Sequence, residues 1–390
     1  MIRILTLSSL FPDSSRPVFG PFVERQTREI ASHPDVDLRV VAPIGLPPWP
    51  LSRHRRYRGF RQVPAMEQWQ GLTVYRPRFL HFPGTAGRFD AAAMARAVLP
   101  LLTTIRTEFA FDMIDAEFFF PDGPAAVALG KACGVPVSIK ARGGDIQFWG
   151  RAPITAPQVL AAGQQAAGML AVSSALKRDM AALGMPEERI TVHYTGVDLD
   201  CFQPVDRIEA KRQRGLQGPL ISCVGGLIAR KGQRLLIEIL PLLPDANLVL
   251  IGNGEDREIL EKSAVALGVN DRVIFTGAIA QSEIAQWLAA SDVMALPSRS
   301  EGLANAWVEA LACGTPIVIC DVGGARELLT AEHPLAGQIV DRDAAKIAAA
   351  IRHLLDNPPS PHAVRKAATG FTWARNRDAL FAHFSSLIGK

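Results

Sequence analysis

Short apolar runs alternate with segments of helical periodicity along the first half of the chain. The apolar runs predict buried strands at residues 2–8, 38–42, 74–77, 111–117, 135–140, 169–174 and 190–194. The segments between them predict helices at residues 21–32, 91–106, 125–133 and 175–183. Such alternation is typical of a doubly wound parallel sheet covered by helices on both faces.

The apolar pattern is lost over residues 203–218 and then resumes. The second half predicts strands at residues 220–224, 248–251, 273–275, 292–297 and 316–320, and helices at 233–242, 255–267 and 305–313. A chain of 390 residues is long enough for two domains. The sequence therefore predicts an α/β protein with one doubly wound domain at residues 1–203, a linker at 203–218, and a second such domain within 204–370.

Composition is ordinary for a globular protein, with 48% hydrophobic and 21% charged residues. The five cysteines are odd in number and form no C-x-x-C pair, which favours reduced thiols over a disulfide framework or a zinc site. The N-terminal apolar run is too short for a signal peptide, and no run reaches the about 20 apolar residues that span a bilayer. We therefore expect a cytoplasmic protein, soluble or peripheral on the inner face of the cell membrane.

The net charge of +4 arises in the first half of the chain. Residues 1–203 hold 22 Lys and Arg against 18 Asp and Glu, whereas the remainder holds 20 of each. Within the first half, the basic-aromatic segment, residues 49–61, interleaves five arginines with Trp49, Tyr57 and Phe60. Three interpretations are open: a solvated loop, a contact with an anionic membrane or lipid phosphate, and a nucleic-acid site. No nucleic-acid recognition motif accompanies the segment, so we expect no nucleic-acid partner.

The most informative run is residues 297–316, which lies between two predicted strands. A helix starting near Asn305 completes a strand–helix–strand unit, whose helix N-terminus lies at the carboxyl edge of the sheet. Unpaired amides near Leu303 to Asn305 suit an anion at that place. Glu301 and Glu309 lie about 12 Å apart if the residues between them are helical, so a diphosphate there has a carboxylate near each side. This layout suits a nucleotide sugar, and two merely solvating carboxylates are the alternative.

The same run resembles the Glu-x7-Glu signature of glycosyltransferase family 4, whose members are retaining enzymes of the GT-B fold. The match includes the preceding Pro-Ser, the glycine after the first glutamate and the run Ala-Cys-Gly-Thr-Pro. The resemblance implies two Rossmann-like domains that face each other across a cleft, the first for the acceptor and the second for the nucleotide sugar. It also implies that Glu301 contacts the donor sugar, that Glu309 binds the ribose, and that a last helix, residues 371–390, packs back on the first domain.

Residues 225–232, Gly-Gly-Leu-Ile-Ala-Arg-Lys-Gly, resemble the family's Gly-Arg-Leu-x-x-x-Lys-Gly element. A glycine turn with cations before a helix suits a phosphate. The resemblance places Lys231 on the donor diphosphate. Gly226 stands at the usual arginine position, and Arg230 is the candidate to supply that cation instead. A plain surface role is the alternative for both Lys231 and Arg230.

The first domain carries two further matches to the family. Gly20, in the loop after the first strand, corresponds to a glycine near the diphosphate, or it is a plain turn glycine. Residues 142–145 resemble the family's His/Arg-Gly-x-Asp loop, with Arg142 where many members have a histidine that contacts the sugar. Arginine cannot act as a base near neutral pH. Asp145 is expected to orient acceptor or donor, or to cap the next segment.

In the second domain the resemblance places the nucleotide base near Gly254 and has it recognised by the backbone at Ala278. Recognition by backbone does not decide between uracil and guanine as the base.

The turn 195–198 resembles the family's Asn-Gly-Val-Asp turn, with Thr195 in place of the asparagine. Asp198 and Asp200 spell a D-x-D sequence, which is not expected to bind a metal in this context.

These features together predict a retaining hexosyltransferase that uses a UDP- or GDP-sugar and an acceptor hydroxyl on a saccharide or lipid-linked saccharide, in the synthesis of cell-surface polysaccharide or glycolipid. Neither a cofactor nor a metal is expected. The alternatives are a 2-epimerase or sugar-phosphate synthase of the same fold, and an inactive GT-B binding scaffold. The residues expected to act in catalysis are Glu301, Lys231, Arg230, Asp145 and Arg142, and those expected to bind the donor are Gly20, Gly226, Gly254, Ala278, Gly302, Leu303, Ala304, Asn305 and Glu309.

Overall fold

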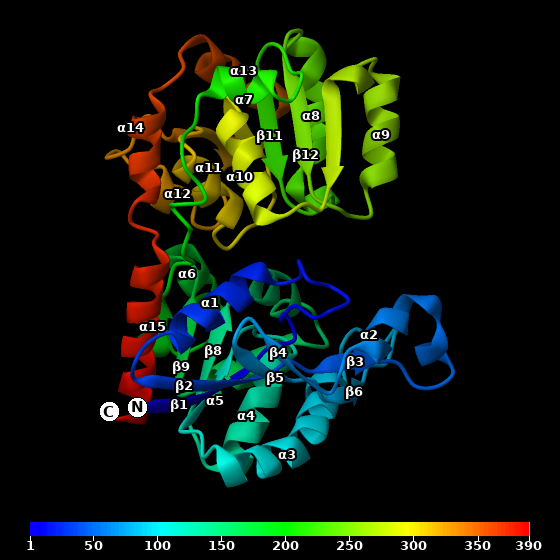
Figure 1. Cartoon of the computed structure of the whole chain (residues 1–390), viewed down its shortest axis with the longest axis vertical. Helices are drawn as coiled ribbons and strands as arrows, with labels where there is room; N and C mark the ends of the chain where they lie inside the picture. The colour runs from blue at the N-terminus through cyan, green and yellow to red at the C-terminus, as the bar shows by residue number, and fades with distance from the viewer. Residues whose placement is uncertain (390) are drawn as a thin grey trace. The chain divides into compact units, whose positions relative to one another are not determined.

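The computed structural model describes residues 1–389 and divides them into two compact units. The first unit is Met1–Thr195 together with the C-terminal helix α15 (Trp373–Ile388), and the second is Gly196–Thr372 (Figure 1). Both units are α/β, as the sequence predicts. Among the described residues, no helix is both long and apolar enough to cross a lipid bilayer.

The first unit is built on an eight-stranded sheet. Its strands are β1 (Ile2–Leu7), β2 (Val36–Val41), β4 (Met66–Trp69), β5 (Leu72–Tyr75), β7 (Met113–Ala116), β8 (Val137–Ala141), β9 (Gly168–Ala171) and β10 (Ile190–Val192). The order is β10-β9-β8-β7-β1-β2-β5-β4, and only β4 runs antiparallel to its neighbour. Two short strands, β3 (Ile44–Leu46) and β6 (Arg78–Leu80), form a separate parallel pair.

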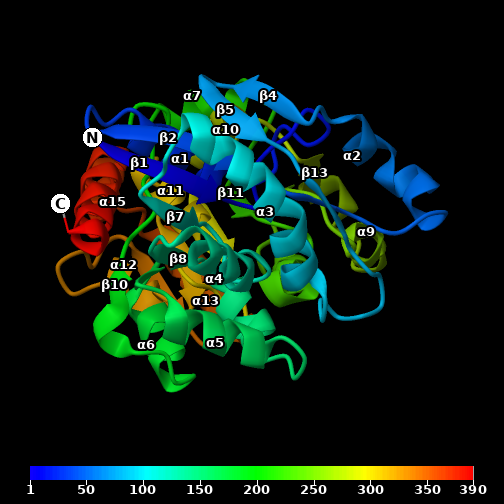
Figure 2. The ribbon, with the colours of Figure 1, turned by 90° about the horizontal axis from the view of Figure 1, so that it is seen from below.

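Helices cover both faces of this sheet. The helices of the first unit are α1 (Pro21–Ala31), α2 (Arg58–Gln62), α3 (Asp90–Glu108), α4 (Asp122–Cys133), α5 (Ala156–Gln165) and α6 (Ser174–Ala182), with 3-10 turns η1 (Leu51–Arg53), η2 (Arg55–Tyr57) and η4 (Glu187–Arg189) and a π-helical turn η3 (Asp145–Trp149). Helices α1 and α15 lie side by side on one face, and α3 and α4 cover the other (Figure 1 and Figure 2).

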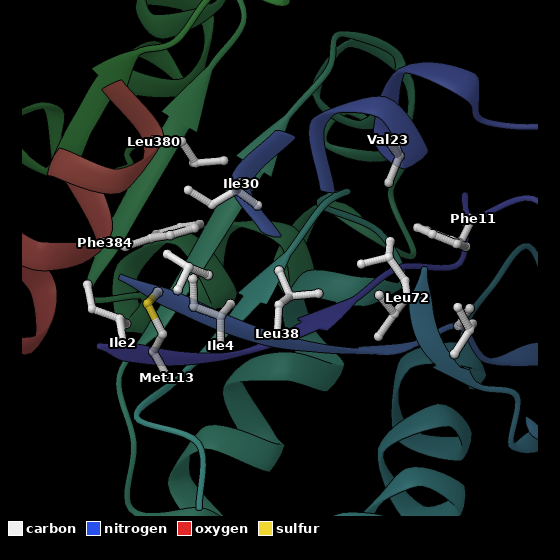
Figure 3. Close-up of a cluster of buried hydrophobic side chains, with 14 of the residues drawn as sticks. Ile2, Ile4, Phe11, Val23, Ile30, Leu38, Leu72, Met113, Leu380 and Phe384 are labelled. Atoms are coloured by element: carbon white, nitrogen blue, oxygen red, sulfur yellow. The ribbon is translucent and has the colours of Figure 1, made fainter. Parts of the chain in front are cut away.

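The core between the sheet and the α1–α15 pair explains why the C-terminal helix belongs to the first unit. Ile2 and Ile4 of β1 pack there with Ile30 of α1 (Figure 3). Leu380 and Phe384 of α15 are completely buried in the same cluster. Burying one such side chain stabilises a fold by about 1.5–3 kcal/mol, so these two residues alone hold α15 firmly on the first unit.

The second unit is built on a six-stranded, wholly parallel sheet. Its strands are β11 (Leu220–Val224), β12 (Asn247–Ile251), β13 (Val273–Gly277), β14 (Val293–Leu296), β15 (Ile317–Cys320) and β16 (Gly337–Val340), in the order β13-β12-β11-β14-β15-β16. The helices are α7 (Arg207–Arg212), α8 (Gln233–Ile239), α9 (Arg257–Ala266), α10 (Gln281–Ala290), α11 (Asn305–Ala312), α12 (Ala325–Leu328), α13 (Ala344–Asp356) and α14 (Pro361–Arg365), with 3-10 turns η5 (Ala229–Lys231), η6 (Leu240–Leu242), η7 (Asn270–Arg272) and η8 (Lys366–Ala368).

The boundary between the units differs from the predicted one. The chain enters the second unit at Gly196, before the predicted boundary at 203/204, because the segment after it is tied to that unit. The guanidinium of Arg365 donates to the carbonyls of Leu199 (2.7 Å) and Phe202 (2.5 Å). The predicted linker 203–218 is also wrong in part, since it contains helix α7, which the sequence pattern did not reveal because the helix is short and polar.

Candidate functional site

Each sheet has one place where the strand order reverses, and in the second unit it lies between β11 and β14. From β11 the chain continues outward to β12 and β13, then crosses over to β14 and continues to β15 and β16 in the opposite direction. Loops at the carboxyl ends of the two central strands therefore diverge and leave room for a ligand. The two loops here are residues 225–232 and 297–304, which are the segments that the sequence singled out.

Glu301 is the centre of a charged cluster in these loops. Its side chain is only 8% exposed, and Nζ of Lys231 lies 2.5 Å from its Oε1. The hydroxyl of Ser298 donates to the same oxygen at 2.7 Å. Arg230 donates from Nη1 to the carbonyl of Ser300 at 2.6 Å and lies 3.9 Å from Oε2 of Glu301. Two cations thus share one carboxylate, so the cluster keeps a net positive charge.

A glycine allows the two loops to come this close. Gly232, which follows η5, has a φ of +80° and caps the start of α8. A Cβ on Gly232 would overlap the carbonyl oxygen of Pro297, which directly follows β14. The close approach carries Lys231 to the loop that holds Glu301, although 70 residues separate them in the chain.

The N-terminus of α11 presents unpaired amides, as the sequence predicts. The helix begins at Asn305, and its N-cap, Ala304, has no side chain that can cap it. Within residues 1–389, the amides of Leu303, Ala304 and Asn305 have no acceptor. Gly302 fixes the turn before them, because its carbonyl accepts from the amide of Gly324 at 2.7 Å. Such a helix start, with the positive end of its dipole, favours an anion.

Glu309 lies one turn into α11 and is only 4% exposed. Nε2 of Gln281, at the start of α10, donates to its carboxylate at 3.3 Å. Burial raises the pKa of Glu309 to about 7, against the opposing effect of this hydrogen bond. The free protein therefore holds a carboxyl group that is ready to ionise when a ligand offers hydroxyl donors.

The other predicted residues of the second unit lie on the same edge of the sheet. Gly254 follows β12, and a Cβ there would overlap the carbonyl of Leu227, so packing requires glycine. Gly226 is different: its nearest neighbour would lie 3.7 Å from a Cβ, so a larger residue has room. Ala278 is exposed directly after β13. The second unit therefore brings three features to one edge of its sheet: the cations Lys231 and Arg230, the unpaired amides at the start of α11, and the exposed backbone at Ala278.

In the first unit, Gly20 is required by packing as well as by backbone shape. It is the N-cap of α1, has a φ of +62°, and a Cβ would overlap the carbonyl oxygen of Leu10. Its loop follows β1, which lies beside β7 at the place where the order of the first sheet reverses. This position is the counterpart of the second unit's ligand edge.

Asp145 acts as an internal cap, which favours the second of its two interpretations. The carboxylate is completely buried and accepts from the amides of Phe119 (3.0 Å), Arg142 (3.0 Å) and Gly143 (2.8 Å). Burial raises the pKa of Asp145, and the hydrogen bonds from these amides oppose the rise. Its side chain shapes the loop that carries Arg142, and no oxygen of it is exposed to a substrate.

Sequence reasoning missed three residues that contact predicted site residues. Ser298 and Gln281 bind the two signature glutamates, and Glu117 pairs with Arg142. Ser298 carried a signal, because it belongs to the Pro-Ser pair before Glu301. The other two gave none, because Gln281 meets Glu309 through the packing of two helices, and Glu117 meets Arg142 through the pairing of two strands that are distant in the chain.

The basic-aromatic segment folds into η1, η2 and α2 and is open to solvent. Trp49 is 74% exposed and Leu51 55%. All five arginines of the segment are exposed, and none of them has an ion pair within residues 1–389. No acidic residue occurs between Asp37 and Glu67 to balance them.

Two family descriptions match the chain, one for each unit. Residues 23–201 match glycosyltransferase family 4, and residues 205–371 match glycosyl transferases group 1. A GDP-mannose-dependent alpha-(1-6)-phosphatidylinositol monomannoside mannosyltransferase of Mycobacterium tuberculosis is 30% identical over 332 residues, which cover 77% of this chain and 84% of that protein.

Solved structures agree on the fold. Sucrose-phosphate synthase from Thermosynechococcus elongatus superposes with a TM-score of 0.81 at 18% identity, over 100% of both chains. Anabaena HepE, solved with UDP and glucose, gives a TM-score of 0.75 at 20% identity, over 99% of this chain and 100% of that one. The fold is GT-B, as expected from the sequence, and the chain is a member of glycosyltransferase family 4.

Proposed function

We propose that this glycosyltransferase moves a hexose, with retention at the anomeric carbon, from a UDP- or GDP-sugar to a hydroxyl of a saccharide or lipid-linked saccharide. The observation that carries the proposal is the cluster of Lys231, Arg230 and Glu301, on the same sheet edge as the unpaired amides of α11. Cations and amides suit a diphosphate, and a buried carboxylate beside them suits sugar hydroxyls.

In this proposal the donor diphosphate binds Lys231, Arg230 and the amides of residues 303–305. Glu301 accepts hydrogen bonds from the sugar, and Glu309 from the ribose. The bond between the anomeric carbon and the diphosphate oxygen breaks, the acceptor oxygen bonds to that carbon on the same face, and the hydroxyl proton passes to the departing phosphate oxygen. Positive charge fixed at the leaving group is the main source of acceleration, and the protein supplies it without a metal.

The substitution Lys231→Met tests this assignment most directly. Removing one fixed donor from a developing anion lowers turnover about 100- to 1,000-fold. A screen of UDP- and GDP-sugars, read as release of the nucleoside diphosphate, first identifies the donor. Lys262→Met, on the exposed face of α9, is the matched control. Turnover within a factor of three of wild type in Lys231→Met would overturn the proposal.

Product analysis separates this activity from its alternatives. With a labelled donor and no acceptor, a 2-epimerase converts the sugar, whereas a transferase releases at most hydrolysis products. A binding scaffold shows no turnover at all. If neither UDP nor GDP raises the melting temperature, that result counts against every enzyme interpretation, since a ligand that binds the native state stabilises it.

For the acceptor, we propose a lipid-linked saccharide at the cytoplasmic face of an anionic membrane, within cell-surface polysaccharide or glycolipid synthesis. Support comes from the unpaired arginines and exposed Trp49 and Leu51 of the basic-aromatic segment. Juxtamembrane cations contribute about 1 kcal/mol each at an anionic surface. Sedimentation with phosphatidylglycerol vesicles at low salt is expected, with release at high salt and no binding to phosphatidylcholine vesicles. Equal binding to both vesicles, or to neither, contradicts the membrane proposal.

A further inference from the structure

A buried polar layer lies at the carboxyl edge of the first unit's sheet, beyond the residues assigned above. Glu117 directly follows β7, and Lys140 belongs to β8, which pairs with β7. Gln26 reaches this layer from α1, and His193 follows β10. All four side chains are buried. A core of this kind is costly unless each group is paired, so its pattern of partners is informative.

Glu117 holds Arg142 by one edge of its guanidinium. Nε of Arg142 donates to the backbone carbonyl of Glu117 at 2.9 Å, and Nη2 donates to its Oε2 in an ion pair. Nε and Nη2 lie on the same side of the planar group, so the two bonds fix its plane. Within residues 1–389, Nη1 of Arg142 has no acceptor. The free edge is therefore presented in a fixed direction.

Both the side chain and the backbone of Glu117 have further hydrogen-bond partners. Nε2 of Gln26 donates to Oε1 of Glu117, and Oε1 of Gln26 accepts from Nζ of Lys140. Nζ of Lys140 lies 2.7 Å from Nδ1 of His193. The amide of Glu117 donates to the carbonyl of Leu7 at 3.1 Å, which extends the pairing of the central strands. The carboxylate cannot turn without breaking this chain of contacts.

The neighbouring carboxyl group, Asp115, accepts none of the hydrogen bonds that the side chain of Arg142 donates in the described part of the chain. Burial, together with the charge of Glu117, raises the pKa of Asp115 well above its usual value. The acceptors that the guanidinium of Arg142 contacts, the backbone carbonyl and the carboxylate, both belong to Glu117. A buried ion pair adds little net stability compared with a packed apolar core. The ion pair between Glu117 and Arg142 is therefore better explained by the orientation it gives the guanidinium than by added stability.

We propose that Glu117 is a positioning residue that aligns the free edge of Arg142 for the oxygens of a bound substrate, with Gln26 and Lys140 holding Glu117 in place. This inference rests on the proposed function, because Arg142 acts on substrate only if the protein transfers a sugar. It assigns Glu117 no contact with substrate.

A double-mutant cycle tests the proposal, with kcat/KM for nucleoside diphosphate release from the donor as the readout. Glu117→Gln is expected to lower kcat/KM about 30-fold in the wild-type background, the size of one misaligned charge-assisted hydrogen bond. In the Arg142→Met background the same change is expected to alter kcat/KM less than twofold, since it acts only through Arg142. Asp112→Asn, directly before β7, is the control and is expected to leave kcat/KM unchanged. Equal losses in both backgrounds overturn the inference.

Two further measurements keep the test decisive if Glu117→Gln folds poorly or the wild type shows no turnover. Arg142→Lys keeps the charge but loses the two-point contact, so it is expected to lose as much kcat/KM as Arg142→Met, and near-wild-type activity overturns the inference. In an arginine-selective NMR spectrum, the Nε–H signal of Arg142 is expected to be protected from exchange and to lose protection in Glu117→Gln; persistence overturns it. A wild type that releases no UDP or GDP from any donor refutes the proposed function instead.

Discussion

Replacing Glu309 by Gln is expected to stabilise the free protein at alkaline pH while weakening its binding of nucleotides. Burial raises the pKa of Glu309 from 4.5 to about 7. At about 1.4 kcal/mol per pH unit, keeping this carboxyl ionised inside the fold costs about 3 kcal/mol above pH 8. Glutamine has nearly the same shape and carries no charge, so the variant avoids this cost.

The direction of the pH effect follows from which state holds the proton. Between the unfolded and folded pKa values of Glu309, the folded protein binds the proton and the unfolded chain does not. The contribution of this group to stability is therefore greatest below about pH 4.5 and is lost as the pH rises through about 7. From pH 5.5 to 8.5, the stability of the Gln variant relative to wild type is expected to rise by about 2 kcal/mol.

Urea unfolding of both proteins across that pH range measures the stability effect. Glu258→Gln, on the exposed face of α9, is the control and is expected to show no pH-dependent difference. A difference between wild type and Glu309→Gln that stays constant from pH 5.5 to 8.5 refutes the account of a buried neutral carboxyl.

Glu309→Gln also tests the role of this carboxyl group in nucleotide binding. If ribose hydroxyls bind the ionised carboxylate of Glu309, wild-type affinity for UDP or GDP is expected to rise about 10-fold more than that of the Gln variant between pH 6 and 8. Calorimetric titration of both proteins at several pH values measures this ratio. If the ratio of wild-type affinity to Gln-variant affinity does not change with pH, the carboxylate of Glu309 does not bind the nucleotide.

Three other substitutions test separate parts of the structure. Glu301→Gln is expected to lower donor turnover about 100-fold, as measured by steady-state kinetics. The affinity for the nucleoside diphosphate alone, as measured by calorimetry, is expected to stay undiminished, because Lys231 loses its ion-pair partner. Gly226→Arg restores the family's cation where a Cβ has room, and is expected to raise nucleotide affinity about fivefold at an unchanged melting temperature, so weaker binding contradicts it. Gly20→Ala is expected to lower the free energy of unfolding by about 3 kcal/mol, against about 1 kcal/mol for Gly71→Ala, because both have positive φ but only Gly20 lacks space for a Cβ; urea titration compares them.

Much of the second unit could be predicted from the sequence, because its site is built from short continuous segments. The glycine-rich turn that leads to Lys231 and the helix start at Asn305 each follow a strand of strong apolar character. Central strands of a doubly wound sheet bring such loops to one edge, so their meeting needs no knowledge of side-chain packing. The first strands and helices of the first unit were predictable for the same reason.

Other features could not be predicted because they depend on weak or long-range signals. Strands β4 and β16 are short and lie at sheet edges, and neither has the run of buried apolar residues that marks a central strand. The roles of Asp145 and Glu117 depend on the pairing of β7 with β8, which places residues 25 or more positions apart in contact. One acidic residue in a loop gives no sign of whether it caps amides or holds a cation.

The two units use their acidic residues in opposite ways at equivalent sheet edges. In the second unit Glu301 is shared by Lys231 and by Arg230, whose side chain is 40% exposed, so the cations keep access to a ligand. In the first unit Glu117 is sealed in the core, and its partner Arg142 is only 12% exposed. A ligand can bind the cations around Glu301 by displacing an ion pair, which suits a diphosphate that binds and leaves in every cycle. The pair of Glu117 and Arg142 has no such freedom, and it suits a group whose direction must stay the same throughout the cycle.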